Sequence, residues 1–305
     1  MPIFKFGYII KSRREEMGYT QEQLADGICS VPTLSRIENG ERMPSKEHFE
    51  MLLQRLGYSN AEVNSFVDKK AFTKHELKFQ LRQAVILKQM DRATELFEEY
   101  KKCICNPTPI DQQSQILYQI LTRPSEYSLA QRLEPLKDAL RLTCPKYEDN
   151  YFPALLSYEE ILLINNIAVA HFYAEGKTKA IDLLFGLKRY YENHIINPEE
   201  VLRTQPLVLY NLSKYLGLVE RYDESIEISS QGIRICVETG RCTMLAKLFF
   251  NLAWALVKRG DADDLGTAKQ SAKKAYYLAV ILRQTKSAQL YRSFFLDIFG
   301  EDISL

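Results

Sequence analysis

The stretch CSVPTLSRIENGERMPS (Cys29 to Ser45) decides the fold of the amino-terminal part of the chain. Ser30 can accept a hydrogen bond from the unpaired amides of a first helical turn, and Pro32 presets the backbone where a missing N–H costs nothing. Gly40 can adopt the left-handed conformation that closes a helix. The stretch therefore predicts a helix of about two turns from near Val31 to near Gly40, too short to be stable without packed neighbours.

The sequence on either side predicts further short helices. Thr20 and Gln23 have the spacing of a capping box, and Ser45 can cap a fourth helix. The expected apolar faces are Phe6, Ile9, Ile10 and Met17 for the helix that ends at Gly18, and Phe49, Leu52, Leu53 and Leu56 for the helix that ends at Gly57. A tight turn near Ile28 joins the second and third helices, which is the arrangement of a helix-turn-helix.

The same region resembles the phage-repressor-type (XRE) helix-turn-helix. The matching residues are Gly18, Thr20, Gln21, Leu24, Ala25, Ser35, Ile37, Glu38, Gly40 and Pro44. The resemblance implies a phosphate contact at Gln21 and an internal ion pair between Arg14 and Glu38. It also implies a second phosphate clamp from Asn39 and Arg42 with the Gly40 amide. The positions implied to face the bases are Val31, Pro32, Thr33 and Arg36, with Ser30 at the helix cap.

The recognition positions depart from the family pattern. Val31 and Pro32 stand where members usually carry polar side chains. Apolar groups can contact a thymine methyl, and Arg36 can bond guanine in two places, so we expect thymine-rich half-sites read partly through DNA shape. The segment 1–66 carries eight Lys or Arg and nine Asp or Glu, so bulk charge gives no support to DNA binding. The alternative is a degenerate helix-turn-helix that binds no DNA.

The rest of the chain predicts paired helices. A small residue recurs where the second helix of each pair should open, at Ala93, Ala130, Ala180, Ser225 and Ala268. Neighbouring copies lie 37 to 50 residues apart, and the best of them resemble tetratricopeptide repeats. We expect an all-α chain, in which an N-terminal helix-turn-helix domain is followed by a right-handed superhelix of tetratricopeptide-like repeats. The last helix, around Ser287 to Gly300, should cap the stack.

Helical spacing predicts which side chains line the concave face of the repeats. Lys247, Asn251, Trp254 and Lys258 follow one another at intervals of four, three and four residues, and Asn211 and Lys214 share the pattern one repeat earlier. His171 is the corresponding candidate further upstream. A carboxamide can donate to and accept from an extended peptide, and lysine suits a carboxylate, so the pattern indicates a peptide site. The alternatives are that Trp254 is core and that His171 is structural.

Together the two halves resemble the peptide-pheromone regulators of the Rgg, PlcR and PrgX type (RRNPP), with the PlcR branch closest. The stretches ICSVPTLSRIENGERMPS and RYDESIEI carry this resemblance. It implies a homodimeric transcription regulator, with residues 1–66 binding double-stranded DNA and residues 67–305 binding a short linear signalling peptide and forming the dimer. The segment from Ser59 to Lys74 is the expected hinge. The resemblance also implies a role in quorum sensing.

Two other functions stay open at this point. The repeat domain could serve only dimerisation or a protein partner, or the chain could inhibit signalling proteins as the family's Rap branch does, although that branch lacks a helix-turn-helix. An enzyme is not expected, because the four histidines lie apart and no nucleophile or phosphate-loop motif occurs. The six cysteines are scattered and are expected to be buried free thiols, so we expect no metal and no cofactor. With no signal-like start and no apolar run of about 18 residues, we place the chain in the cytoplasm without a membrane partner.

Overall fold

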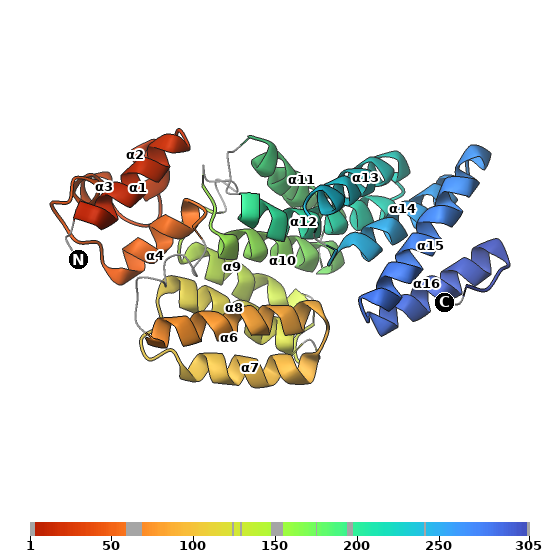
Figure 1. Cartoon of the computed structure of the whole chain (residues 1–305), viewed down its shortest axis with the longest axis horizontal. Coiled ribbons are helices and arrows are strands. Elements are labelled where there is room, and N and C mark those ends of the chain that lie inside the picture. Colours follow the sequence, from red (N-terminus) through yellow and green to blue (C-terminus); the bar gives the residue numbers. More distant parts are fainter. Residues whose placement is uncertain are drawn as a thin grey trace. The chain divides into compact units, whose positions relative to one another are not determined.

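The chain is helical wherever regular structure is described. The computed structural model describes residues 4–58, 69–123, 125–128, 130–147, 155–174, 176–193, 198–240 and 242–303. The expected hinge, residues 59–74, falls mostly outside these ranges. The chain forms two compact units, one of residues 1–175 with 190–200 and one of residues 176–189 with 201–305. Figure 1 traces it from the amino-terminal helices in red to the last helix in blue.

Helices make up both units (Figure 1). The first contains α1 (Phe4–Glu16), α2 (Gln21–Ala25), α3 (Val31–Glu38), α4 (Lys46–Arg55), α6 (Lys69–Ile86), α7 (Met90–Lys102), α8 (Pro109–Thr122), η1 (Ala130–Arg132), α9 (Leu133–Arg141) and α10 (Tyr158–Ala174). The second contains most of α11 (Lys177–Asn193) and α12 (Pro198–Leu218), then α13 (Tyr222–Glu238), α14 (Leu245–Arg259), η2 (Ala262–Asp264), α15 (Leu265–Ile281) and α16 (Thr285–Phe299). Among the described helices, none combines the length and apolar character needed to cross a bilayer.

The predicted helix-turn-helix is confirmed. The Ser30 hydroxyl accepts a hydrogen bond from the Thr33 amide at 3.3 Å, so α3 begins at Val31. Its other end closes at Gly40, whose φ of +72° is the left-handed conformation that glycine adopts without strain. The capping box of Thr20 and Gln23 also forms at the start of α2. Local capping chemistry therefore fixed both helices of the motif.

Apolar side chains from all four helices form the core of this domain. Ile10, Leu24, Leu34, Leu52 and Leu56 have no exposed surface. Fully burying one such side chain stabilises the fold by roughly 1.5–3 kcal/mol, which compensates for the shortness of each helix. The predicted apolar positions Ile10, Met17, Leu52, Leu53 and Leu56 are buried, Phe49 is partly buried, and the side chains of Phe6 and Ile9 lie outside the described ones.

Small residues mark the repeats, as predicted, in four of five places. Ala93 of α7, Ala180 of α11, Ser225 of α13 and Ala268 of α15 are buried, which lets a neighbouring helix approach closely. The prediction for Ala130 is wrong. That residue is exposed and begins the short helix η1, because the chain makes a 3-10 turn before α9 starts.

The last helix packs on the repeat before it, as expected for a cap. Phe295 of α16 has no exposed surface, and Tyr291 stacks on Phe250 of α14 with ring centroids 4.4 Å apart and planes 21° apart. An offset stack of this kind adds about 0.5–1.5 kcal/mol beyond burial. These aromatic contacts join α14 and α16 within the second unit.

The six cysteines are free thiols, but the prediction that they are buried is only partly right. Cys144 and Cys236 are buried and Cys29 is half-buried, whereas Cys103, Cys105 and Cys242 are exposed. Burial raises the pKa of the Cys236 thiol to about 11, which keeps it protonated at neutral pH.

Candidate functional site

The recognition helix α3 exposes two of the four residues predicted to face bases. Pro32 and Arg36 are exposed, while Val31 is partly buried against the domain core. The Thr33 hydroxyl lies 2.9 Å from the Ser30 hydroxyl, so these two side chains are engaged with each other at the helix cap. Among the four predicted base-facing residues, Arg36 is thus an exposed side chain whose guanidinium has the geometry to bond guanine in two places.

The predicted ion pair between Arg14 and Glu38 is confirmed. Nε and Nη2 of Arg14 donate to the two carboxylate oxygens of Glu38 at 2.6 and 2.8 Å, and Nη1 donates to the Tyr19 carbonyl at 2.8 Å. The Glu38 hydrogen bond is the largest influence on the Arg14 guanidinium, whose pKa lies above its ordinary value although burial opposes the shift. The pair thus joins α1 to the last turn of α3.

The residues predicted to clamp phosphate lie at the two ends of the motif. Asn39 and Arg42 are exposed, and the amides of Glu41 and Arg42 both donate to the Arg36 carbonyl, which fastens this loop to α3. Gln21 donates its side-chain amide to Glu38 at 2.7 Å. That bond uses one N–H of an amide group that carries two.

The described cations of the domain range from buried to exposed, with Lys11 and Arg13 half-buried. Arg14 and Arg55 are buried in ion pairs. Arg36, Arg42 and Lys46 are exposed, and they lie on or directly after the recognition helix. A domain whose charged residues sum to −1 can thus still present positive charge where a phosphate backbone would meet it.

The second unit brings together the candidate peptide residues of α12 and α14. We define the α12–α14 stripe as Asn211, Lys214, Lys247, Asn251, Trp254 and Lys258. The Lys258 ammonium lies 5.8 Å from the centre of the Trp254 ring, and the Lys247 ammonium lies 5.5 Å from that of Tyr210. The contact between Lys247 and Tyr210 joins the two helices.

Gly217 determines how close α12 comes to Trp254. A Cβ at Gly217 would lie 3.0 Å from Cζ3 of the Trp254 indole and 3.4 Å from the Ser225 hydroxyl, closer than side chains normally approach. Tyr222 packs edge-on against the same indole, with ring centroids 6.2 Å apart. Trp254 is therefore held on one side by α12 and α13 but keeps part of its surface exposed.

Asn251 has partners within the helix stack that the sequence did not predict. Its side-chain amide donates to the Tyr210 carbonyl at 3.1 Å and to the Ser213 hydroxyl at 2.8 Å. The amide donor of this candidate peptide residue is therefore already engaged inside the stack. Asn211, at the matching place on α12, is buried as well.

His171 belongs to the first unit, where it lies on α10 with 1% of its surface exposed. A contact between His171 and a peptide is a separate prediction from those for the α12–α14 stripe, since the two sites lie in different units.

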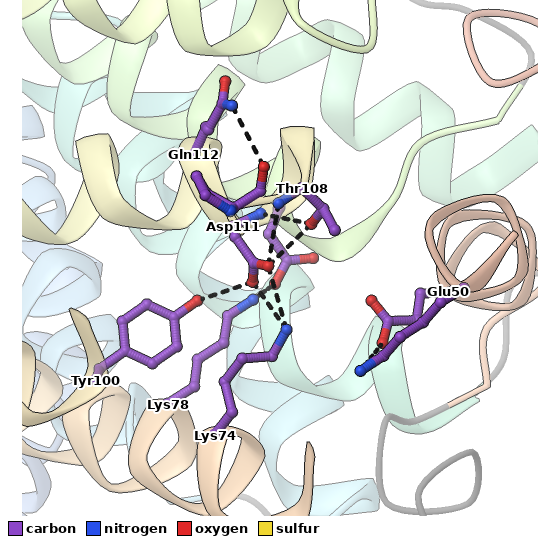
Figure 2. Close-up of polar contacts among 10 residues, drawn as sticks. Glu50, Lys74, Lys78, Tyr100, Thr108, Asp111 and Gln112 are labelled. Atoms are coloured by element: carbon purple, nitrogen blue, oxygen red, sulfur yellow. Dashed lines mark hydrogen bonds and ion pairs between the residues drawn. The ribbon is translucent and has the colours of Figure 1, made fainter. Parts of the chain in front are cut away.

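A buried polar cluster in the first unit was not predicted (Figure 2). The Lys74 ammonium lies 3.0 and 3.2 Å from the Asp111 carboxylate oxygens, and the Tyr100 hydroxyl donates to the same carboxylate at 3.4 Å. Burial would raise the pKa of Asp111, but Lys74, Lys78 and the Thr108 amide together outweigh burial, and the net pKa lies below the ordinary value. Lys78 pairs in turn with Glu159 of α10. These contacts join α6, α7, α8 and α10.

Glu50 of α4 faces this cluster from the helix-turn-helix domain (Figure 2). Burial raises the pKa of its carboxyl, while the charges of Lys74, Lys46 and Lys78 act in the opposite direction. The Lys46 ammonium is 4.0 Å away. Sequence spacing could have indicated part of this arrangement, because Lys74 and Lys78 occupy one face of α6, but nothing in the sequence pairs them with distant carboxylates.

The described residues offer no metal site: within them no group of three or more His, Cys, Asp or Glu side chains could hold an ion. Taken with the fold, the capped recognition helix defines the class of the protein, a helix-turn-helix protein with an appended helical repeat domain.

Two known protein families match parts of the chain. Residues 10–62 match the family described as "Helix-turn-helix", and residues 132–296, more than half of the chain, match the "RNPP family C-terminal domain". The chain belongs to the RNPP family. A helix-turn-helix and an RNPP C-terminal domain in one chain are the parts of a DNA-binding regulator, which speaks against an enzyme.

Solved structures share the fold. PlcR of Bacillus thuringiensis in complex with the peptide PapR7 and DNA is 22% identical, with 94% of this chain and 99% of that chain covered and a TM-score of 0.61. ComR from S. thermophilus is 17% identical in its apo form, covering 97% and 99% of the two chains with a TM-score of 0.58. Its complex with DNA and the signalling peptide ComS gives 15% identity, 96% and 99% coverage and a TM-score of 0.53. Among curated proteins, none matches the chain significantly.

Proposed function

We propose that this chain is a sequence-specific transcription regulator whose DNA binding is gated by a short signalling peptide, as in quorum sensing. The observation that carries the proposal is the presence, in one chain of the RNPP family, of an exposed recognition helix and a lysine- and tryptophan-bearing stripe on the repeats. The protein would act in the cytoplasm. It would bind DNA as a homodimer, because a two-fold dimer presents two recognition helices to successive major grooves.

The DNA half of the proposal rests on α3 and its flanks. Arg36 and Pro32 would meet base edges, while Gln21, Asn39 and Arg42 would hold the backbone of the duplex. Ser30, Val31 and Thr33 would support this contact from the helix cap. PlcR and ComR, which share the fold, have been captured with DNA, which supports the assignment.

The peptide half rests on the α12–α14 stripe. Exposed lysine beside an aromatic ring, as at Lys258 and Trp254, suits a carboxylate together with an apolar side chain. Lys214 and Lys247 add positive charge, so a peptide with an acidic residue or a free terminal carboxylate is the best fit. His171, which belongs to the other unit, stays a separate proposal for a peptide contact.

A second function is favoured by one observation. Because the Asn251 amide is engaged with Tyr210 and Ser213, part of the stripe serves to hold α12 and α14 together. The repeats could then support dimerisation or a protein partner without sensing a peptide. The two proposed functions differ in whether a peptide changes the fluorescence of Trp254.

The first experiment is a titration of the purified full chain against DNA from upstream of its own and adjacent genes, at one fixed salt concentration. Each titration is run with and without short synthetic peptides encoded next to the gene. Trp254 is the only tryptophan in the chain, so its fluorescence reports peptide binding independently of DNA. Specific DNA binding that a peptide shifts supports the gated regulator, while specific binding with no effect on Trp254 or on affinity favours the second function.

A further inference from the structure

Helix α4 of the helix-turn-helix domain ends in an arginine that is buried against the repeats. Arg55 is 4% exposed, and its Nη2 lies 3.3 Å from the carboxylate of Glu160 on α10. Its Nη1 donates to the carbonyl of Asp26, in the turn between α2 and α3. One guanidinium therefore bonds both the turn of the DNA-binding motif and the repeat domain.

Glu160 is itself fixed by the start of α10. Its carboxylate accepts hydrogen bonds from the Thr143 hydroxyl at 2.6 Å and from the Ser157 amide at 2.5 Å, and the Ser157 hydroxyl accepts from the Glu160 amide at 3.3 Å. Serine and glutamate three residues apart form a capping box. The carboxylate that binds Arg55 is thus also part of the capping box at the amino terminus of α10. Arg55 and the start of α10 therefore cannot move independently while this contact is formed.

The turn of the motif also packs on the repeats through its backbone. A Cβ at Gly27 would lie 2.0 Å from the Thr143 carbonyl oxygen, and Gly27 has a φ of +69°. Only glycine fits this position, both for its conformation and for the close approach. Pro32, Arg36 and Arg42 remain exposed, so this contact leaves the proposed DNA-facing residues accessible.

Such a contact is all-or-none. Burial acts against the charge of Glu160, but Arg55 and the hydrogen bonds from Thr143, Ser157 and Cys144 together outweigh burial, and the net pKa of Glu160 lies below its ordinary value. Partial separation would leave a buried charge without its partner, which is strongly unfavourable, whereas full separation lets water reach both groups. The domain is therefore either docked in one orientation or released.

We propose that the Arg55–Glu160 contact positions the recognition helix: through it the repeat domain fixes the orientation of α3 and so the spacing of operator half-sites that the dimer accepts. The proposal rests on the proposed function for DNA binding and dimerisation. Arg55 and Glu160 are positioning residues that touch no base. Releasing the contact leaves each helix-turn-helix domain able to bind a half-site in an orientation that the repeats no longer fix, which removes the demand for one spacing.

The test compares the full-length wild type with Glu160→Gln, which removes the charge but keeps a hydrogen-bonding side chain. Glu99→Gln, on the exposed face of α7, is the matched control. Hydrogen exchange is followed in the turn, residues 26–30, and in α1. We expect roughly tenfold faster exchange in the turn of E160Q, unchanged exchange in α1, and no effect of E99Q.

Binding is then measured to the shortest DNA fragment that the wild type recognises and to the same fragment with about five base pairs, half a helical turn, inserted at its centre. We expect the insertion to weaken wild-type binding by about tenfold or more and E160Q binding by no more than about threefold. Unchanged hydrogen exchange in the turn of E160Q overturns the proposal. Faster exchange in E160Q also overturns it if the insertion weakens E160Q binding as much as it weakens wild-type binding. A wild type that tolerates the insertion overturns it as well.

Arg55→Gln serves as the second variant, because it retains a donor for the Asp26 carbonyl. If the amides of α1 exchange faster throughout the helix in both variants, Arg55 and Glu160 stabilise the fold of the helix-turn-helix domain itself and the proposal is wrong. If the wild type binds no fragment specifically, the proposed function fails, and the exchange data alone decide whether the contact orients the turn. The two failures are therefore distinguishable.

Discussion

Arg14 on the first helix donates two hydrogen bonds, of 2.6 and 2.8 Å, to Glu38 at the end of the recognition helix. Both residues are buried, so Arg14→Met would leave a buried carboxylate with only the Gln21 amide, at a cost of about 3–5 kcal/mol. Arg14→Met combined with Glu38→Gln should recover much of that loss. Urea denaturation of the full chain measures both, with Arg13→Met as the control. A loss no larger than that of R13M would contradict the prediction.

Arg36→Ala should remove base-specific affinity while sparing phosphate contacts. One bidentate arginine–guanine contact discriminates by about 1–3 kcal/mol, so binding to the preferred site should weaken roughly 5- to 150-fold. Non-specific DNA should bind nearly as before. Arg234→Ala, which removes an exposed arginine from α13, controls for the change in net charge. Fluorescence anisotropy at one salt concentration gives the ratio of specific to non-specific affinity for each variant. An unchanged base preference would show that Arg36 reads no base.

Glu50→Gln should stabilise the protein at neutral pH. Burial raises the pKa of the Glu50 carboxyl above its ordinary value of 4.5, so the folded chain disfavours the charged form. The unfolded chain begins to lose the Glu50 proton as the pH rises past 4.5, and from there the charged carboxylate opposes folding. The stabilisation from replacing it is therefore present at pH 7 and vanishes as the pH falls below about 4.5. Thermal melts across this range should show a gain of about 2–4 °C in Tm per kcal/mol relieved.

Glu99→Gln, which alters an exposed carboxylate of α7, is the control for the Glu50 melts and should leave Tm unchanged at every pH. A Glu50→Gln protein that melts at or below the wild-type temperature at pH 7 would mean that the Lys74 and Lys46 charges stabilise the carboxylate more than burial disfavours it.

Gly217→Ala should disturb Trp254 although alanine favours helices. The added methyl would lie 3.0 Å from Cζ3 of the indole, so either the ring or α12 must move. Gly266→Ala on α15 is the control, because its Cβ would meet nothing within 4 Å and the change should stabilise the helix by up to about 1 kcal/mol. The emission spectrum of the single tryptophan should shift in G217A only. Equal spectra in both variants would show that the indole tolerates the methyl without moving.

Lys258→Ala tests the proposed peptide contact without disturbing the fold. Lys258 is exposed and lies 5.8 Å from the Trp254 ring, so its loss should cost little stability but weaken binding of a carboxylate-bearing peptide. Losing a charged hydrogen bond of about 1.5–3 kcal/mol would weaken binding by roughly 10- to 150-fold. Lys286→Ala, exposed on α16, is the control, and Trp254 fluorescence is the readout. Equal affinity of the two variants would remove Lys258 from the peptide site.

The sequence predicted what depends on local chemistry. Ser30 and Thr20 cap helices through their side-chain hydroxyls, and Gly40 closes α3 through its left-handed backbone, so the starts of α2 and α3 and the end of α3 could be placed closely. Family resemblance supplied the Arg14–Glu38 pair. The prediction failed for Ala130, because the 3-10 turn that displaces it depends on how the chain enters α9.

Contacts between distant segments were beyond the sequence. Arg55 and Glu160 are 105 residues apart, and only the Ser157–Glu160 spacing hinted at a capping box on α10. Asn251 was predicted as a peptide ligand because its stack neighbours could not be seen, and the structure gives it Tyr210 and Ser213 as partners. Buried polar groups find their partners only when the helices pack, and for that reason spacing alone could not assign them.

Gly27 and Thr143 set a condition on building chimeras from this protein. The helix-turn-helix meets the repeats backbone to backbone at Gly27, and through Arg55 at an anion supplied by α10. A chimera that joins residues 1–58 to a different repeat domain would contain Arg55 without its partner Glu160. Its turn at Gly27 would also lack the Thr143 carbonyl against which it packs. The transferable cassette therefore includes Thr143, Ser157 and Glu160, and a reporter assembled without them should lose its choice of operator length before it loses its affinity for DNA.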